Sequence, residues 1–253
     1  ARLMKEEVGQ QFAEFGLRRR AFTWMHDRIA VLNAQYGGDS YVGSSSPYHC
    51  ELTGYVSKCT VNHFWYLLHG ARYGVEDANE LASIAWRAVY GPDLGTALPD
   101  TWGRRLYFST VAPGMTQMIN SYRHDSDPPK DFTDDLVAYF THPRNRRDLK
   151  GITAMFSDSV SDVTAPKIYD YANQWFDVSF GIGGALTNNK RFFKKTPAYR
   201  PLNMVAKPVD FSFDLGKTFV PIAKVPDGKG KNVGDPAIIA EIERIKASYP
   251  WIY

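Results

Sequence analysis

Two histidines and the only two cysteines of the chain lie close together in the sequence, as His49, Cys50, Cys59 and His63. Thiolates and imidazoles are the ligands that zinc prefers. If this segment were one helix, Cys59 and His63 would share a face, whereas Cys50 would point to roughly the opposite side. A complete zinc site therefore requires a break near Gly54. Otherwise we expect buried cysteines, hydrogen-bonded histidines and no cofactor.

A second polar run, His124, Asp125 and Asp127, places two carboxylates two residues apart. Such a pair can hold a divalent cation. The prolines that follow directly, Pro128 and Pro129, favour a capped turn instead. We therefore expect a turn at this place and assign no catalytic residue to it.

Glycine-rich runs in the chain do not match known phosphate loops. The run from Gly228 to Lys231 lacks an upstream glycine at the required spacing and a following Ser or Thr. The run from Gly181 to Gly184 is not expected to open a helix after a strand, as a dinucleotide-binding loop would. No nucleophile elbow surrounds Ser44, Ser45 and Ser46. The sequence thus predicts no catalytic residue.

Basic residues gather toward the C-terminal end. Residues 187–234 contain ten Lys and Arg and three Asp, a net charge of +7, while the whole chain carries +3. Such asymmetry indicates an acidic partner, which could be another protein subunit, anionic lipid or RNA. Aromatic side chains interleaved with cations suit both a protein groove and stacking on bases. The predicted partner-binding residues are Arg191, Phe192, Phe193, Lys194, Lys195, Tyr199, Arg200, Phe211 and Phe213.

Composition limits the class of protein. Of the 253 residues, 44% are hydrophobic and 14% are aromatic, which is enough for a large core. We expect no membrane span, because no stretch approaches about 18 consecutive apolar residues. The lack of a secretory signal pattern and the low cysteine count favour a reducing compartment, with the mitochondrion preferred over the cytoplasm. Ala1 is consistent with removal of an initiator Met and with cleavage of a presequence.

Apolar periodicity predicts mainly helices. A seven-residue repeat predicts one long helix over residues 5–32, and a second is expected over 48–69 after a Gly/Ser-rich loop. The repeating residues are Val8, Phe15, Phe22 and Ile29. Further helices are predicted from periodicity and capping residues at 81–89, 131–140, 146–157, 164–176 and 235–248. Prolines prevent long helices between 187 and 234, where residues 209–213 alternate like an edge strand.

These elements predict a mainly α protein. A helical body of about six to eight helices would occupy residues 1–186. An extended, proline-rich, basic arm would follow over residues 187–253 and would end in the short helix at 235–248. The aromatic residues of this arm indicate that it lies against a surface.

The absence of a catalytic motif, together with this arm, predicts a non-catalytic structural or accessory subunit of a large multi-subunit assembly. A mitochondrial respiratory complex or ATP synthase, or an organellar ribosome, is favoured by analogy of composition. In this hypothesis the arm docks on neighbouring subunits. An RNA-binding coat or nucleocapsid protein is one alternative. A metal-dependent enzyme that uses the Cys/His cluster is the other.

Overall fold

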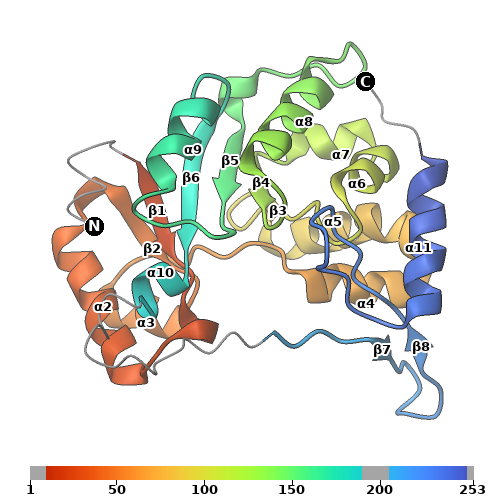
Figure 1. Cartoon of the computed structure of the whole chain (residues 1–253), viewed down its shortest axis with the longest axis horizontal. Coiled ribbons are helices and arrows are strands. Elements are labelled where there is room, and N and C mark those ends of the chain that lie inside the picture. The colour runs from red at the N-terminus through yellow and green to blue at the C-terminus, as the bar shows by residue number, and fades with distance from the viewer. Residues whose placement is uncertain (1–9, 190–204, 250–253) are drawn as a thin grey trace. The chain divides into compact units, whose positions relative to one another are not determined.

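The computed structural model describes residues 10–189 and 205–249 (Figure 1). Contacts divide the chain into two compact units. The first joins the residues up to Cys59 to those from Thr153 to Val205, and the second joins Thr60–Ile152 to the residues from Ala206 onward. Each unit is thus assembled from two separate stretches of chain. The division differs from the predicted boundary between residues 186 and 187.

The first unit is built around four parallel strands in the order β2-β1-β6-β5. They are β1 (Gln11–Glu14), β2 (Tyr41–Ser44), β5 (Thr153–Phe156) and β6 (Asp177–Ile182). Phe12 of β1 pairs with Tyr41 on one side and Phe180 on the other, and all three are buried. Since parallel strands are covered on both faces, apolar residues fill both sides and no alternating pattern marks them in the sequence.

Helices connect these strands. The helix α2 (Thr23–Tyr36) links β1 to β2, and α9 (Ala165–Ala172) links β5 to β6. Shorter segments complete the unit, namely α3 (Pro47–Thr53), α10 (Gly184–Thr187) and the 3₁₀ turns η1 (Leu17–Arg19) and η2 (Gly38–Ser40). Each parallel pair with its crossover helix is a βαβ arrangement, which is the usual way to join parallel strands.

The second unit is rich in helices. Its helical segments are α4 (His63–Tyr73), α5 (Val75–Tyr90), α6 (Arg104–Thr110), α7 (Pro113–Met118), α8 (Pro129–Thr141), the 3₁₀ turn η3 (Leu149–Gly151) and α11 (Pro236–Ser248). Two short parallel strands, β3 (Thr96–Ala97) and β4 (Ser121–His124), pair within it. An antiparallel pair joins β7 (Asp210–Phe211) to β8 (Val220–Pro221). Aromatic rings form much of its core, among them Tyr66, Tyr107, Phe108, Tyr122, Tyr139 and Phe140.

The predicted arm belongs to the second unit only from Ala206 onward. Ile222, Ala223 and Val225 are buried. The indole Nε1 of Trp102 donates to the carbonyl of Ala223 at 2.8 Å, and the amide of Val225 donates to the carbonyl of Thr101 at 3.0 Å. These bonds tie the arm to its own chain, so these three buried residues have a partner surface within the molecule, whereas Phe213, Leu215 and Phe219 are exposed.

The prediction of a mainly α fold is wrong, because parallel strands organise the structure into an α/β fold. Residues 11–14 form β1 instead of the start of a long first helix, and α2 begins only at Thr23. The helix predicted over 146–157 is replaced by η3 and β5. In both places the backbone pairs with β6, which is distant in sequence. Such pairing overrides the local helical pattern.

The helix predicted over 48–69 is interrupted. The first part, α3, ends at Gly54, whose φ of 74° lies in the left-handed region. The second part, α4, begins after Asn62, whose side chain accepts a hydrogen bond from the amide of Trp65. A C-terminal glycine and an N-terminal Asn cap are the expected residues for these two helix ends.

Four predicted helices are confirmed within α5, α8, α9 and α11. Asp235 caps α11 by accepting from the amide of Ala237 at 2.7 Å. Trp175 and Phe176 lie beyond the end of α9; Phe176 is buried and Trp175 is exposed. The run from Gly181 to Gly184 was not expected to open a helix after a strand. This expectation is wrong, because β6 ends at Ile182 and the short helix α10 begins at Gly184. Among the described residues no helix has the length and apolar character needed to cross a membrane.

Candidate active site

Two carboxylates of the second unit lie just beyond the carboxyl ends of its parallel strands. Asp100 follows β3 and Asp125 follows β4, directly after His124. The residue that begins α4, His63, completes a group whose ligand atoms all lie within 4.8 Å of one another. Val61, two residues before His63, donates its amide to the carbonyl of Thr96 in β3 at 3.1 Å. Ligands bind most often at this edge of parallel sheets.

Both ring nitrogens of His63 are engaged. Its Nε2 lies 2.9 Å from Oδ2 of Asp125, and its Nδ1 lies 3.0 Å from the hydroxyl of Thr101. Burial lowers the pKa of His63 to about 3, despite its hydrogen bond with Asp125. The imidazole is therefore neutral near pH 7. It donates from Nε2 to Asp125 and accepts from Thr101 at Nδ1, because the carboxylate is the obligatory acceptor.

The two aspartates differ in charge behaviour. Burial alone would raise the pKa of Asp125, but the guanidinium of Arg123 and the hydrogen bond from His63 hold it well below its usual range. Burial raises the pKa of Asp100 to about 6, although Lys224 acts in the opposite direction. Near pH 7 the carboxyl group of Asp125 is ionised. That of Asp100 becomes ionised only as the pH passes about 6.

Asp100 is fixed through one oxygen only. Its Oδ1 accepts from the hydroxyl of Ser126 at 2.8 Å and from the amide of Asp227 at 3.2 Å. Its Oδ2 is buried and has no hydrogen-bond partner among the described residues. Lys224, itself only 6% exposed, acts electrostatically on both Asp100 and Asp125, and burial lowers its pKa. A buried carboxylate oxygen that interacts electrostatically with a buried ammonium group is suited to a polar or charged ligand.

Arg104 holds the loops around this group. Its guanidinium makes ion pairs with Asp127 at 2.7 Å, Asp135 at 2.6 Å and Asp227 at 3.2 Å. The arginine is 4% exposed. Because these pairs join the segment after β4, helix α8 and the arm, they position the segments that carry Asp125 and Lys224.

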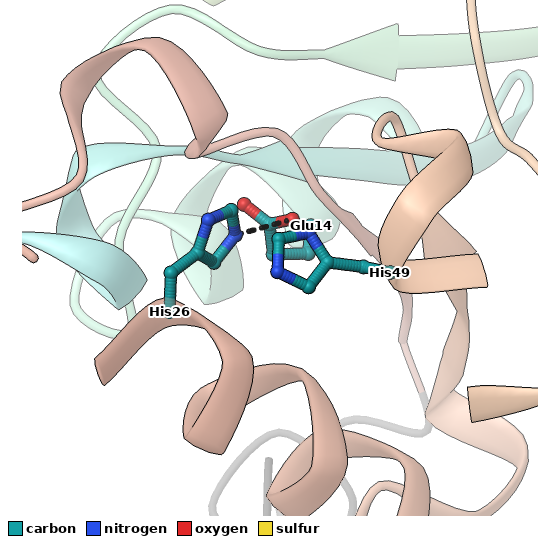
Figure 2. A group of neighbouring side chains, drawn as sticks. All are labelled: Glu14, His26 and His49. Carbon is teal, nitrogen blue, oxygen red and sulfur yellow. Dashed lines mark ion pairs between the residues drawn. The ribbon is translucent and has the colours of Figure 1, made fainter. Parts of the chain in front are cut away.

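The structure divides the predicted Cys/His cluster. His63 joins Asp100 and Asp125 in the second unit, whereas His49 lies with Glu14 and His26 in the first (Figure 2). The four residues therefore do not surround one ion. The thiol of Cys50 contacts the carbonyls of Ser44 and Val56, and that of Cys59 contacts the hydroxyl of Ser57 and the carbonyl of Ser45. Both cysteines are free thiols.

Two of the predicted partner-binding residues pack on α4. Phe211 meets Phe64 edge to face with the ring centroids 5.4 Å apart, and the guanidinium of Arg72 lies 5.1 Å from the ring centroid of Phe213. The remaining ones lie outside the described residues, namely Arg191, Phe192, Phe193, Lys194, Lys195, Tyr199 and Arg200. From the sequence, Asp125 was predicted to lie in a turn, and Asp100, Thr101 and Lys224 were not predicted as site residues. Asp100 and Thr101 follow β3, which has only two residues and is too short to show a strand pattern in the sequence.

The chain resembles enzymes of known name. A nicotinate phosphoribosyltransferase from Chromohalobacter salexigens is 32% identical over 242 residues, which cover 96% of this chain and 60% of that protein. One from Methanococcoides burtonii is 34% identical over 225 residues, covering 88% and 52%. The crystal structure of the enzyme from Porphyromonas gingivalis superposes with a TM-score of 0.89 at 31% identity, covering 97% of this chain and 61% of the other.

These likenesses overturn the predicted function. The hypothesis of a non-catalytic, all-α accessory subunit that docks on a large complex is wrong, because the relatives are transferases with an α/β fold. The two alternatives, an RNA-binding coat protein and a metal-dependent enzyme that uses the Cys/His cluster, are wrong for the same reason. The chain spans about 60% or less of the length of these relatives.

The match extends over almost the whole chain. The model of the nicotinate phosphoribosyltransferase (NAPRTase) family matches residues 10–246, which include both compact units and the group around His63. The chain belongs to the nicotinate phosphoribosyltransferase family.

Proposed function

We propose that this chain carries a site for transfer of a phosphoribosyl group to nicotinate, formed by Asp100, Asp125, His63 and Lys224. The proposal rests on family membership and on one observation above all. The buried Oδ2 of Asp100 has no partner among the described residues and lies in a group that also contains a buried lysine. A ligand with hydroxyl and anionic groups would supply a hydrogen-bond donor to Oδ2 of Asp100 and a negative charge to Lys224.

The chemistry of such a transfer explains why carboxylates and cations are needed together. The ring nitrogen of nicotinate forms a bond to C1 of the ribose, while the bond from C1 to the oxygen of the leaving group breaks and its electron pair leaves with that oxygen. Positive charge develops on C1 and the ring oxygen of the sugar, and negative charge on the leaving group. Fixed charges of opposite sign stabilise both.

The residues divide these roles by charge. Asp100 and Asp125 supply carboxylate oxygens for the ribose hydroxyls and for the positive charge on the sugar. Lys224 and Arg123 supply cations for the anionic groups of the donor. His63 is a positioning residue, because its neutral ring holds Asp125 through Nε2 and Thr101 through Nδ1. The same carboxylates could hold a divalent cation that accompanies a phosphorylated donor.

The test is a direct assay of the chain with nicotinate and 5-phosphoribosyl diphosphate. Nucleotide product is followed by chromatography, and donor binding is followed separately by calorimetry. We expect saturable donor binding and product formation. We also expect Asp125→Asn to lower the rate by about 10²-fold or more, since it removes a charge fixed toward the transition state.

Asp131→Asn is the matched control, because Asp131 is an exposed carboxylate at the start of α8. It should leave both the rate and donor binding unchanged. A folded chain that neither binds the donor nor forms product would contradict the proposal. So would an Asp125→Asn variant with an unchanged rate. Replacing nicotinate by nicotinamide in the same assay tests whether the acceptor must carry a carboxylate.

A further inference from the structure

Three side chains of the first unit converge in its interior without a role in the proposed reaction. Glu14 ends β1, His26 lies in α2 and His49 lies in α3 (Figure 2). Their exposed fractions are 0%, 0% and 2%. One ligand atom of each lies within 4.8 Å of the others. Three elements thus direct metal-ligating groups to one buried point.

Glu14 is fixed as an anion at this point. The hydroxyl of Ser44 donates to its Oε2 at 2.7 Å, the amide of Gly16 donates to its Oε1, and Nε2 of His26 lies 2.9 Å from Oε2. Both carboxylate oxygens thus accept hydrogen bonds, as an ionised carboxylate does. A buried carboxylate of this kind requires a cation beside it.

His49 has the arrangement expected of a metal ligand. Its Nε2 lies 2.9 Å from Oδ1 of Asp27, while its Nδ1 is buried with no hydrogen-bond partner among the described residues. Histidines that bind metals usually donate one ring N–H to a carboxylate and coordinate through the other nitrogen. The donor set therefore leaves Nδ1 of His49 as the coordinating atom. The ring centroids of His26 and His49 are 4.0 Å apart. Figure 2 shows both rings next to the carboxylate of Glu14.

A protonated His26 would neutralise Glu14 but would leave the rest of the group unsatisfied. Nδ1 of His49 would remain a buried acceptor without a donor. Leaving a buried polar atom unsatisfied destabilises the fold. A divalent cation instead satisfies one carboxylate oxygen and one nitrogen of each ring at once.

We propose that Glu14, His26 and His49 form a zinc site that ties β1, α2 and α3 together. Two imidazoles and one carboxylate are ligands that zinc binds well, and three protein ligands leave one coordination position for a small molecule such as water. Of the predicted zinc ligands only His49 belongs to this set. Asp27 is the outer partner that orients His49. The site stands independently of the proposed transferase activity.

The test measures zinc bound to the full chain after dialysis against a weak chelator, by elemental analysis, and zinc affinity by competition with a chromophoric chelator. We expect one zinc ion per chain. His49→Gln should abolish stoichiometric binding, because it removes a ligand while keeping a polar side chain of similar size. Asp27→Asn should weaken the affinity by about 10–100-fold, the usual effect of removing an outer partner of a ligating histidine.

Matched controls separate this site from other zinc-binding groups. Asp39→Asn changes an exposed carboxylate of the same unit, and His142→Gln changes a histidine outside the cluster. Both should bind zinc as the unchanged chain does, and circular dichroism should show that every variant is folded. An unchanged chain that retains no zinc would overturn the proposal and favour an ion pair between Glu14 and protonated His26. Retention that His49→Gln and Asp27→Asn leave intact would overturn it as well.

Discussion

Burial gives Asp100 a pKa of about 6, whereas Asp125, which contacts Arg123 and His63, stays ionised far below that pH. The proposed reaction uses ionised Asp100. In the free enzyme, kcat/KM should therefore rise with pH about tenfold per unit below pH 6 and level off above it, because the carboxylate form is populated above its pKa. The measurement is kcat/KM for the phosphoribosyl donor between pH 5 and pH 8.

Asp100→Asn supplies the comparison for this pH profile. The amide keeps the shape of the side chain but cannot ionise, so the variant should have a low kcat/KM without the rise near pH 6. Asp131→Asn, which changes an exposed carboxylate, should keep the profile of the unchanged chain. A rise near pH 6 that persists in Asp100→Asn would assign the titration to another group and remove Asp100 from the proposed role.

The sequence indicated some site residues but not their grouping. His63 and Asp125 were both noted, as a zinc candidate and as part of a turn, yet they are separated by 62 residues and nothing local pairs them. Glu14 and His26 carried no signal, because each is a single polar residue within an apolar pattern. A group assembled from several elements becomes visible only when the fold brings its members together.

Among the elements, helices with a wide apolar face were predicted, and so was an edge strand at 209–213, where β7 lies, but the short parallel strands were not. The helices α5 and α11 have their own periodicity and stop signals, which a sequence displays directly. The strand β5 is a four-residue segment whose partner β6 begins more than twenty residues later, and it was predicted as part of a helix. Its identity depends on a crossover connection that local propensity does not encode.

Gly54 decides where α3 ends, and this can be tested by a pair of glycine substitutions. Its φ is +74°, and a Cβ at this position would meet nothing within 4 Å. Gly54→Ala should therefore destabilise the chain by about 1 kcal/mol through backbone strain alone, since L-residues avoid the left-handed region. Denaturant unfolding followed by circular dichroism measures the change in the free energy of unfolding.

Gly114 is the matched control for Gly54. It lies in α7 with a helical backbone, and a Cβ there would also meet nothing within 4 Å. Gly114→Ala should be neutral or stabilise the chain by up to about 1 kcal/mol, because alanine is the better helix former. Equal effects of the two substitutions would show that the left-handed backbone at Gly54 is not what separates α3 from α4.

At the scale of the whole molecule, the basic arm was predicted to dock the chain on the subunits of a large complex, and this prediction is wrong. Its excess of positive charge predicted an acidic partner outside the chain. At Lys224 the structure shows acidic groups within the same unit, namely Asp100 and Asp125. Net charge indicates that cations need counter-charges but does not tell whether these belong to the same chain. The described arm residues contribute both to the core of the second unit and to the proposed active site.

If the arm is part of that core, a buried arm residue should matter for the stability of the chain itself. Ile222 is 3% exposed, whereas Leu215, in the turn between β7 and β8, is fully exposed at 101%. Ile222→Ala should lower the free energy of unfolding by about 2–5 kcal/mol, because it removes buried methyl groups and leaves a cavity. Leu215→Ala removes a similar apolar volume from solvent and should change it by less than about 0.5 kcal/mol. Urea unfolding of the two variants at equal concentration measures both values. Equal, small effects would instead mean that the arm contributes little to the stability of its own unit.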